Sequence, residues 1–260
     1  MQWRLGVVGA PIAHSRSPEL HAAGLRLAGL EGSSERVELD ASRGAALRDL
    51  LPGRFDALSV TAPLKSIAFE LCDEVDDVAQ RTQSVNSLLW REGRLFGRST
   101  DGAGFVDALA YVAHATPADR HVVILGAGGA ASALVDALVH HGASSVVVHG
   151  RNEARVLAIT QRYDQVYAHS LVYRPIDLII NTVPAHARDH EAAVLQGVST
   201  DTVVVDITYE PERSAWLALY EEFGCQVANG RAMLVFQAAR QLSWWFNQPV
   251  EGAALFEVTR

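Results

Sequence analysis

Short apolar runs alternate with amphipathic stretches along the chain, which is the pattern of strands alternating with helices. In the first hundred residues the predicted strands are 4–9, 34–39 and 55–60, and the predicted helices are 17–30, with Ser17 as N-cap, 42–51 and 63–71. Residues 86–97 predict a hairpin that turns at Glu92 and Gly93. This alternation is typical of an α/β unit with a mostly parallel sheet.

A second run of strands and helices follows a predicted helix at 101–115. Strands are predicted at 122–125, 144–150, 176–182 and 202–207, with a helix after the first strand and another at 152–163. The apolar spacing of 230–247 predicts a long helix whose aromatic end needs a packing partner, and we expect it to pack back on the first unit. The sequence therefore predicts two α/β domains, with a boundary near residue 102.

A glycine-rich loop opens the second unit, between a predicted strand and a predicted helix. It reads Gly126-Ala127-Gly128-Gly129-Ala130-Ala131, which is the G-x-G-x-x-A form of the dinucleotide fingerprint. The first glycine permits the tight turn, and Gly128 lets backbone N–H groups approach a pyrophosphate at the helix N-terminus. The small Ala131 allows close packing of helix on strand. The loop thus predicts a Rossmann-like dinucleotide-binding domain.

The residues after the next predicted strand indicate which dinucleotide is bound. A carboxylate at this place would hold the ribose 2′-hydroxyl of NAD, but the chain has Arg151, Asn152 and, four positions after Arg151 on the same predicted helical face, Arg155. A guanidinium can bind a 2′-phosphate through two hydrogen bonds and stack on adenine. We therefore favour NADP over NAD. The alternative is that both arginines are solvated surface residues.

Composition narrows the class of partner. The chain has 260 residues, 49% hydrophobic and 20% charged, and a net charge of −8, which disfavours a nucleic-acid or anionic-membrane surface. No apolar run is long enough to span a bilayer, and the N-terminus lacks the pattern of a secretory signal, so we expect a cytoplasmic location. Cys72 and Cys225 form no disulfide framework or metal spacing, and we expect both thiols to be buried. Small-molecule chemistry is the leading class.

Two charged residues in the first unit are candidates for catalysis. Lys65 lies in the first turn of a helix that Pro63 is predicted to open, where the helix dipole disfavours a positive charge. A residue that is unfavourable for its local structure often has a functional role. The alternative is that Lys65 is an ordinary flexible lysine on the surface. Asp101 lies at the start of the helix predicted at 101–115, where capping is as good an explanation as catalysis.

Several polar residues are candidates for holding a substrate. Ser15 and Ser17 offer hydroxyls and backbone N–H groups at a helix start, which suits a carboxylate, although Ser17 can serve as N-cap alone. Asn86 offers an amide that can bind substrate hydroxyls or cap a turn. Each of these sites is ambiguous by itself.

Taken in order, the motifs resemble those of the shikimate dehydrogenase family over essentially the whole chain. They are GAPIAHSRSP at 9–18, SVTAPLK at 59–65, VNS at 85–87, STDGAG at 99–104, GAGGAA at 126–131, NTVP at 181–184 and AMLVFQA at 232–238. The resemblance implies an NADP-dependent oxidoreductase that acts on a CH–OH group. It would reduce 3-dehydroshikimate to shikimate reversibly with NADPH, in aromatic amino acid (chorismate) biosynthesis.

The resemblance also implies roles for individual residues. Lys65 and Asp101 match the catalytic pair, and the substrate-binding positions match Ser15, Ser17, Thr61, Asn86, Tyr209 and Gln237. The cofactor positions match Gly126, Ala127, Gly128, Gly129, Ala130, Arg151, Asn152, Arg155 and Met233. Residues 1–102, completed by 236–260, would form the substrate-binding catalytic domain, and 103–235 the NADP-binding Rossmann domain. A monomer or a homodimer is expected.

The chain departs from the family pattern at a few positions. Ser99 stands where Asn is usual, and Ala185-His186 replaces a frequent Gly-Met pair. These departures bear on affinity more than on reaction type. Ser17 favours shikimate, because quinate-using relatives often have Thr there. A quinate/shikimate dehydrogenase of a catabolic route and a non-catalytic NADP-binding paralogue are the alternatives. His186 and His190 have a spacing that metal ligands can use, but with no third ligand we predict no metal.

Overall fold

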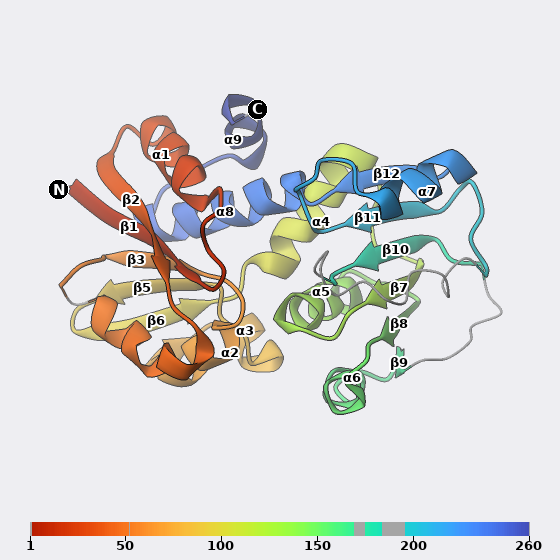
Figure 1. Cartoon of the computed structure of the whole chain (residues 1–260), viewed down its shortest axis with the longest axis horizontal. Coiled ribbons are helices and arrows are strands. Elements are labelled where there is room, and N and C mark those ends of the chain that lie inside the picture. Colours follow the sequence, from red (N-terminus) through yellow and green to blue (C-terminus); the bar gives the residue numbers. More distant parts are fainter. Residues whose placement is uncertain (1, 52, 169–174, 184–195, 260) are drawn as a thin grey trace. The chain divides into compact units, whose positions relative to one another are not determined.

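The computed structural model describes residues 2–51, 53–168, 175–183 and 196–259. The chain divides into two compact units, residues 1–104 with 235–260 and residues 105–234 (Figure 1). The division falls within two helices, α4 (Asp101–Ala113) and α8 (Arg231–Phe246). Both units are built from α/β elements, which confirms the predicted fold class.

The first unit contains a mixed six-stranded sheet. Its strands, in spatial order, are β2 (Glu31–Glu38), β1 (Gln2–Gly9), β3 (Ala57–Val60), β5 (Ser87–Arg91), β6 (Arg94–Arg98) and β4 (Glu74–Val75). β1 is parallel to β2 and β3, and β4 is parallel to β6, whereas β5 is antiparallel to both of its neighbours. Three of the five described strand pairs are parallel, in line with the predicted mostly parallel sheet, and the predicted hairpin of β5 and β6 introduces the two antiparallel pairs. The turn of this hairpin is the predicted one, with φ of 53° at Glu92 and 77° at Gly93.

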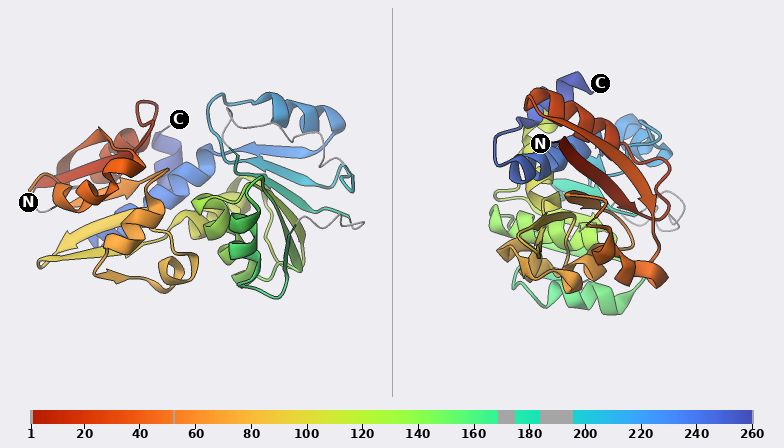
Figure 2. Two further views of the ribbon diagram at one scale, coloured as in Figure 1. Left: turned by 60° about the horizontal axis from the view of Figure 1, so that its bottom comes forward. Right: turned by 90° about the vertical axis from the view of Figure 1, so that its left-hand side faces the viewer.

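Helices cover both faces of this sheet. One face, with Val8, Leu58 and Val60, packs against the 3-10 helix η1 (Ala41–Leu50) and α2 (Lys65–Leu71). Ser59, which points to the opposite face, reaches α1 (Ser17–Leu27) and α8 through hydrogen bonds. Figures 1 and 2 show α1 next to α8, and a Cβ on Gly24 would lie 2.4 Å from Leu242. The long C-terminal helix thus packs on the first unit, as predicted. The short helices α3 (Asp77–Thr82) and α9 (Gly252–Val258) complete the unit.

In the first unit, the starts of two helices and the type of another differ from the prediction. Arg16, rather than Ser17, is the N-cap of α1, and Ser17 is its first residue. The segment predicted as a helix at 42–51 is a 3-10 helix whose start Asp40 caps, and Gly44 within it disfavours an α-helix. α2 begins at Lys65 rather than at Pro63.

The second unit contains a fully parallel sheet among its described residues. The spatial order is β12 (Gln226–Asn229), β11 (Val203–Asp206), β10 (Leu178–Asn181), β7 (His121–Leu125), β8 (Ser145–His149) and β9 (Val166–Ala168). The central strands are almost entirely buried, as apolar runs of this kind predict. Leu125 is in register with Asn181 and His149, so the carboxyl ends of these strands meet at one edge. This edge carries the glycine loop.

Two helices of the second unit, α5 (Gly129–His140) and α6 (Glu153–Thr160), follow the predicted alternation. A third, α7 (Ala215–Phe223), lies in a segment for which no element is predicted from the sequence. Asn152 caps α6 by accepting from the Arg155 N–H, and Ser214 caps α7 by accepting from the Leu217 N–H. Gly224 follows the last residue of α7 as its C-cap, with a φ of 100° that favours glycine.

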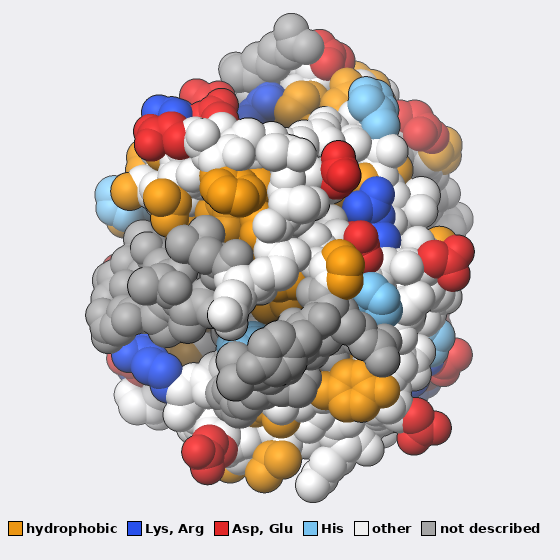
Figure 3. Space-filling view, turned by 90° about the vertical axis from the view of Figure 1, so that its right-hand side faces the viewer, with side chains coloured by type: hydrophobic (Ala, Val, Ile, Leu, Met, Phe, Trp, Pro, Cys, Tyr) orange, Lys and Arg blue, Asp and Glu red, His pale blue; other side chains and the backbone are white. Residues whose placement is uncertain are grey.

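The helix lengths, the surface charge and the burial of the two cysteines can be compared with the sequence prediction. Among the described helices, none is long and apolar enough to cross a bilayer. Acidic and basic side chains are interspersed over the described part of the face in Figure 3, in line with a net charge of −8. Cys225 is buried as expected, but Cys72 is only partly buried, and burial raises the pKa of its thiol to about 12.

Candidate active site

An ion pair joins the two candidate catalytic residues. Lys65 is the first residue of α2 and Asp101 is the first residue of α4, and Nζ of Lys65 lies 2.5 Å from Oδ2 of Asp101. The side chains are 16% and 7% exposed, so solvent screens the pair far less than a surface salt bridge. The arrangement places an ammonium group, which can donate a proton, against a carboxylate that orients it.

Asn86 connects this pair to neighbouring polar groups. Its Nδ2 donates to the second oxygen of Asp101, Oδ1, at 2.8 Å. Oγ1 of Thr100 and Oε1 of Gln237 are also within hydrogen-bond distance of Nδ2, at 3.0 and 3.1 Å. Both oxygens of Asp101 therefore have a donor, and the carboxylate is fixed in orientation.

Hydrogen bonds that involve backbone atoms hold Asn86 and Gln237 in place. The amide N–H of Thr100 donates to Oδ1 of Asn86 at 2.8 Å, and the Thr100 hydroxyl donates to the carbonyl of Gln237 at 3.1 Å. α4 and α8 approach closely at Gly104, where a Cβ would lie 2.5 Å from backbone atoms of Gln237. This close approach brings Gln237 to Asn86, and both are predicted to bind substrate.

The turn before α1 brings two hydroxyls together. Oγ of Ser15 lies 3.2 Å from Oγ of Ser17 and accepts from the Ser17 N–H at 3.3 Å. Arg36 on β2 donates to the carbonyl of Ser15 at 2.8 Å and to Glu19 at 2.6 Å, which fastens the turn to the sheet. Arg16 donates to the carbonyl of Thr259 at 3.2 Å. Hydroxyls and N–H groups at a helix start suit a carboxylate.

Two further predicted substrate residues lie in different units. Thr61 follows β3, donates its N–H to the carbonyl of Val8 at 2.9 Å and accepts from the Leu64 N–H at 3.0 Å. A Cβ at Gly9 would lie 2.4 Å from the Thr61 methyl group, so β1 passes close to it. Tyr209 follows β11 in the second unit, and its role in the site stays a prediction.

The glycine loop has the features that a pyrophosphate site needs. Gly126 has a φ of 109°, and a Cβ there would lie 2.2 Å from the Thr182 hydroxyl, so only glycine fits this turn. A Cβ at Gly128 would meet nothing within 4 Å, so the space beside this residue is open. Gly128 is the N-cap of α5 and makes no side-chain cap, so first-turn N–H groups such as those of Gly129 and Ala130 can meet an anion.

The two predicted 2′-phosphate arginines follow β8. Arg151 and Arg155 are exposed, as a guanidinium that receives a phosphate from solvent must be. α6 begins only at Glu153, because Asn152 caps it, so Arg151 precedes the helix. The prediction that both arginines share a helical face is therefore wrong.

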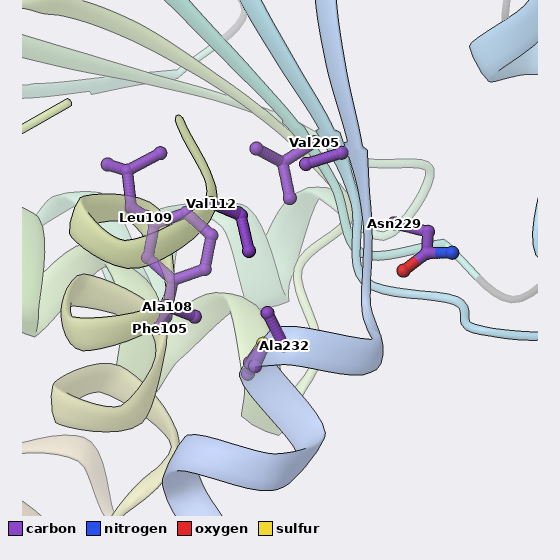
Figure 4. Close-up of a pocket in the computed structure, with 9 residues that line it drawn as sticks. Phe105, Ala108, Leu109, Val112, Val205, Asn229 and Ala232 are labelled. Atoms are coloured by element: carbon purple, nitrogen blue, oxygen red, sulfur yellow. The ribbon is translucent and has the colours of Figure 1, made fainter. Parts of the chain in front are cut away.

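Met233, predicted to contact nicotinamide, lies in a small apolar pocket of the second unit. It is 8% exposed, and the pocket is also lined by Phe105 and Leu109 of α4, Val205 of β11 and Asn229 of β12 (Figure 4). His186 and His190 lie outside the described residues. Within the described ranges, no group of three or more His, Cys, Asp or Glu residues could hold a metal ion.

Comparison with known proteins identifies the family. A family model described as "Shikimate dehydrogenase substrate binding domain" matches residues 7–88, and one described as "Shikimate / quinate 5-dehydrogenase" matches residues 108–208. A protein of Exiguobacterium named "Shikimate dehydrogenase (NADP(+))" is 35% identical over 245 residues, which cover 93% of this chain and 92% of the relative. The chain belongs to the shikimate dehydrogenase family.

Solved structures agree with this membership. The shikimate 5-dehydrogenase of Thermus thermophilus in complex with NADP(H) and shikimate is 31% identical, with a TM-score of 0.87, over 100% of this chain and 99% of that one. The 5-ketofructose reductase of a Gluconobacter strain is 25% identical, with a TM-score of 0.81, over 99% and 97%. The resemblance to shikimate dehydrogenases predicted from the motifs is confirmed.

Sequence reasoning missed several residues that shape the site of this family member. Asp76 caps α3 and accepts from the Ser99 N–H at 3.4 Å, next to Thr100 and Asp101. Burial raises the pKa of its carboxyl group. His21, Ser59 and Gln241 form a buried hydrogen-bonded line toward Asn86. A polar residue inside a predicted buried strand, such as Ser59, was the available signal.

Proposed function

We propose that this chain catalyses the reversible NADPH-dependent reduction of 3-dehydroshikimate to shikimate, in aromatic amino acid biosynthesis. The observation that carries the proposal is the 2.5 Å pair of Lys65 and Asp101, with Asn86 on the second carboxylate oxygen. Membership of the shikimate dehydrogenase family supports it, because relatives with that name match almost the whole chain.

Lys65 supplies the proton in this proposal. When the 3-keto group is reduced, its oxygen becomes negative, and the ammonium group hydrogen-bonds this oxygen and donates a proton to it. The product is the alcohol, and Lys65 recovers its proton from solvent. Asp101 orients the ammonium group and accepts a hydrogen bond from a neighbouring substrate hydroxyl.

The remaining polar residues hold the substrate in our proposal. Ser15 and Ser17 bind the carboxylate, with Tyr209 near the same group. Asn86, Thr61 and Gln237 bind hydroxyls. Nδ2 of Asn86 has two hydrogens but three acceptors within 3.1 Å. One of the three acceptors therefore receives no hydrogen from Asn86 at a given moment and can accept one from a substrate hydroxyl. Such positioning accounts for a large part of the rate gained in reactions of this kind.

The second unit's residues fit NADP. Gly126, Ala127 and Gly128 shape the turn, and the N–H groups of Gly129 and Ala130 at the start of α5 bind the pyrophosphate. Arg151 and Arg155 bind the 2′-phosphate, Asn152 keeps the start of α6 in place between them, and Met233 packs on the nicotinamide. Bound NADPH supplies the hydride. We accordingly assign substrate binding to residues 1–102 with 236–260, and NADP binding to 103–235.

A spectrophotometric assay at 340 nm tests the proposal. Purified protein with NADP and shikimate should form NADPH, and quinate at the same concentration should react much more slowly, in line with serine at position 17. No NADPH formation with shikimate contradicts the proposal. Faster turnover of quinate supports the catabolic alternative, and binding of NADP with no turnover of either substrate supports a non-catalytic paralogue. A cytoplasmic location and a monomeric or dimeric state belong to the same proposal.

A further inference from the structure

A line of hydrogen-bonded side chains in the first unit ends on the backbone of Asn86. We call Ser34, His21, Ser59 and Gln241 the polar line; they lie on β2, α1, β3 and α8. Oγ of Ser34 is 2.7 Å from Nδ1 of His21, whose Nε2 is 2.9 Å from Oγ of Ser59. Ser59 donates to Oε1 of Gln241 at 2.6 Å, and Nε2 of Gln241 donates to the carbonyl oxygen of Asn86 at 3.0 Å.

The chemistry of each group fixes the direction of these bonds. Oε1 of Gln241 can only accept, so Ser59 gives its single hydrogen to it. Oγ of Ser59 must then accept from His21, which places the imidazole hydrogen on Nε2 and leaves Nδ1 to accept from Ser34. This assignment needs a neutral imidazole. His21 is fully buried, and burial lowers its pKa to about 3, so the ring is neutral at the pH of an assay.

Burial makes the polar line depend on its three buried members, His21, Ser59 and Gln241. His21 is 0% exposed, Gln241 1%, Asn86 2% and Ser59 6%, so water cannot easily replace a lost partner. Removing one member leaves the next with an unsatisfied buried polar atom. The three buried side chains therefore act as one unit, and a break at any of them weakens the end that holds Asn86.

That end lies at the site described above. The carbonyl of Asn86 also accepts from the Val60 N–H at 2.8 Å, so two donors fix the backbone where β3 and β5 lie side by side. The carboxamide of the same residue reaches Oδ1 of Asp101 at 2.8 Å. A shift of this backbone would therefore move the carboxamide relative to Asp101.

We propose that the polar line is a positioning element of the active site, which holds the backbone of Asn86 through Gln241 so that its carboxamide meets Asp101 and a substrate hydroxyl. This inference rests on the proposed function, in which Asn86 binds substrate. Ser59 and Gln241 are positioning residues, because they act on the site only through Asn86.

Kinetics of Ser59→Ala and Gln241→Met test the proposal. Each variant should lower kcat/KM for shikimate by about tenfold or more, mostly through a higher KM for shikimate, with the KM for NADP unchanged. Ser59→Thr, which keeps the hydroxyl, should recover most of the loss. The double variant should lose no more than the worse single variant, because one break already interrupts the polar line.

Ser145→Ala is the matched control. Ser145 is a similarly buried serine, 7% exposed, whose Oγ lies 2.8 Å from Nδ1 of His121 in the second unit, at the end of β8 away from the glycine loop. Its kcat/KM should stay within about twofold of the wild-type value. Three results would overturn the proposal: wild-type kinetics in Ser59→Ala, equal impairment of Ser59→Thr and Ser59→Ala, or losses that multiply in the double variant.

A second measurement needs no substrate and keeps the two proposals separate. In ¹H–¹⁵N spectra, the Val60 amide should exchange with deuterium faster in Gln241→Met and Ser59→Ala than in wild type and Ser145→Ala, and the carboxamide signals of Asn86 should shift. Unchanged exchange and signals overturn the positioning role. An inactive wild-type protein with the expected exchange pattern refutes the proposed function alone. If Ser59→Ala does not fold, Gln241→Met and Ser59→Thr decide by the same criteria.

Discussion

Lys65 and Asp101 stand 36 positions apart in the sequence, and each is the first residue of a helix, yet their side chains meet at 2.5 Å. A helix N-terminus favours a carboxylate and disfavours an ammonium group. The carboxylate at the start of α4 therefore compensates for the unfavourable lysine at the start of α2. Because both side chains begin at helix ends that the sheet holds in place, the pair is preorganised.

Ser15→Ala and Ser17→Ala should weaken the binding of substrate with little effect on turnover. The two hydroxyls lie 3.2 Å apart in the turn that we assign to the carboxylate, remote from the reacting carbon. Each loss should raise the KM for shikimate about tenfold, the effect of removing a hydrogen bond to a charged group. Steady-state kinetics measure this, with the exposed Ser42→Ala as control. A fall in kcat at constant KM would refute the assignment.

Arg151→Ala should change cofactor preference. The exposed guanidinium after β8 is assigned to the 2′-phosphate, which NADH lacks, so the KM for NADPH should rise by about tenfold or more while that for NADH changes little. Arg213→Ala is a suitable control, because Arg213 is an exposed arginine of the same unit that pairs with Glu221 at 2.6 Å. Equal losses for both cofactors would show that Arg151 does not distinguish them.

Two glycine substitutions should separate stability from cofactor binding. A Cβ at Gly104 would lie 2.5 Å from backbone atoms of Gln237, so Gly104→Ala should lower the free energy of unfolding by about 1–3 kcal/mol. A Cβ at Gly128 meets nothing within 4 Å at a φ of −91°, so Gly128→Ala should keep its stability but raise the KM for NADP.

Urea unfolding and NADP kinetics of both variants check this pair of predictions. Gly53→Ala is the control, because a Cβ there also meets nothing within 4 Å and the residue belongs to the first unit, whereas the glycine loop belongs to the second. It should change neither quantity. Normal NADP kinetics in Gly128→Ala would argue against a pyrophosphate at this loop.

His21 should make the protein less stable as the pH falls. Burial lowers its pKa from 6.5 to about 3 in the folded state. Below pH 6.5 the imidazole of His21 is therefore protonated in the unfolded chain but stays neutral in the folded chain. Its contribution to the free energy of unfolding is complete above pH 6.5 and is lost as the pH falls toward 3. Between about pH 7.5 and pH 5 this loss is about 2 kcal/mol. Urea unfolding at both values measures it, and His21→Gln should show a correspondingly smaller loss. Equal losses would indicate a protonated His21.

Much of the fold could be predicted from the sequence, because strong local signals mark its elements. The glycine loop, the Glu92-Gly93 turn and the buried strand ahead of Gly126 each depend on a few adjacent residues. The spatial order of the strands in the first unit could not be predicted, because strand order depends on contacts between distant segments. The start of α6 was misplaced because Asn152 acts as a cap, which separates Arg151 from the helix.

The candidate site shows the same contrast. Lys65 and Asp101 could be identified as candidates because each is a charged residue at a predicted helix start, where the helix dipole disfavours a lysine and favours an aspartate. The polar line could not be found, because His21, Ser59 and Gln241 are far apart in sequence and each alone looks like an ordinary polar residue. Only the fold shows that the hydroxyl of Ser59 bonds to the side chain of Gln241, 182 positions away.

The rate of shikimate oxidation by wild-type protein and by Lys65→Ala, followed at 340 nm with saturating NADP, tests the central claim most directly. We predict that the wild-type protein forms NADPH and that Lys65→Ala lowers kcat by about 10²-fold or more, with a modest change in the KM for shikimate, as expected for the loss of a positioned proton donor. A Lys65→Ala variant with near-normal turnover would contradict the account.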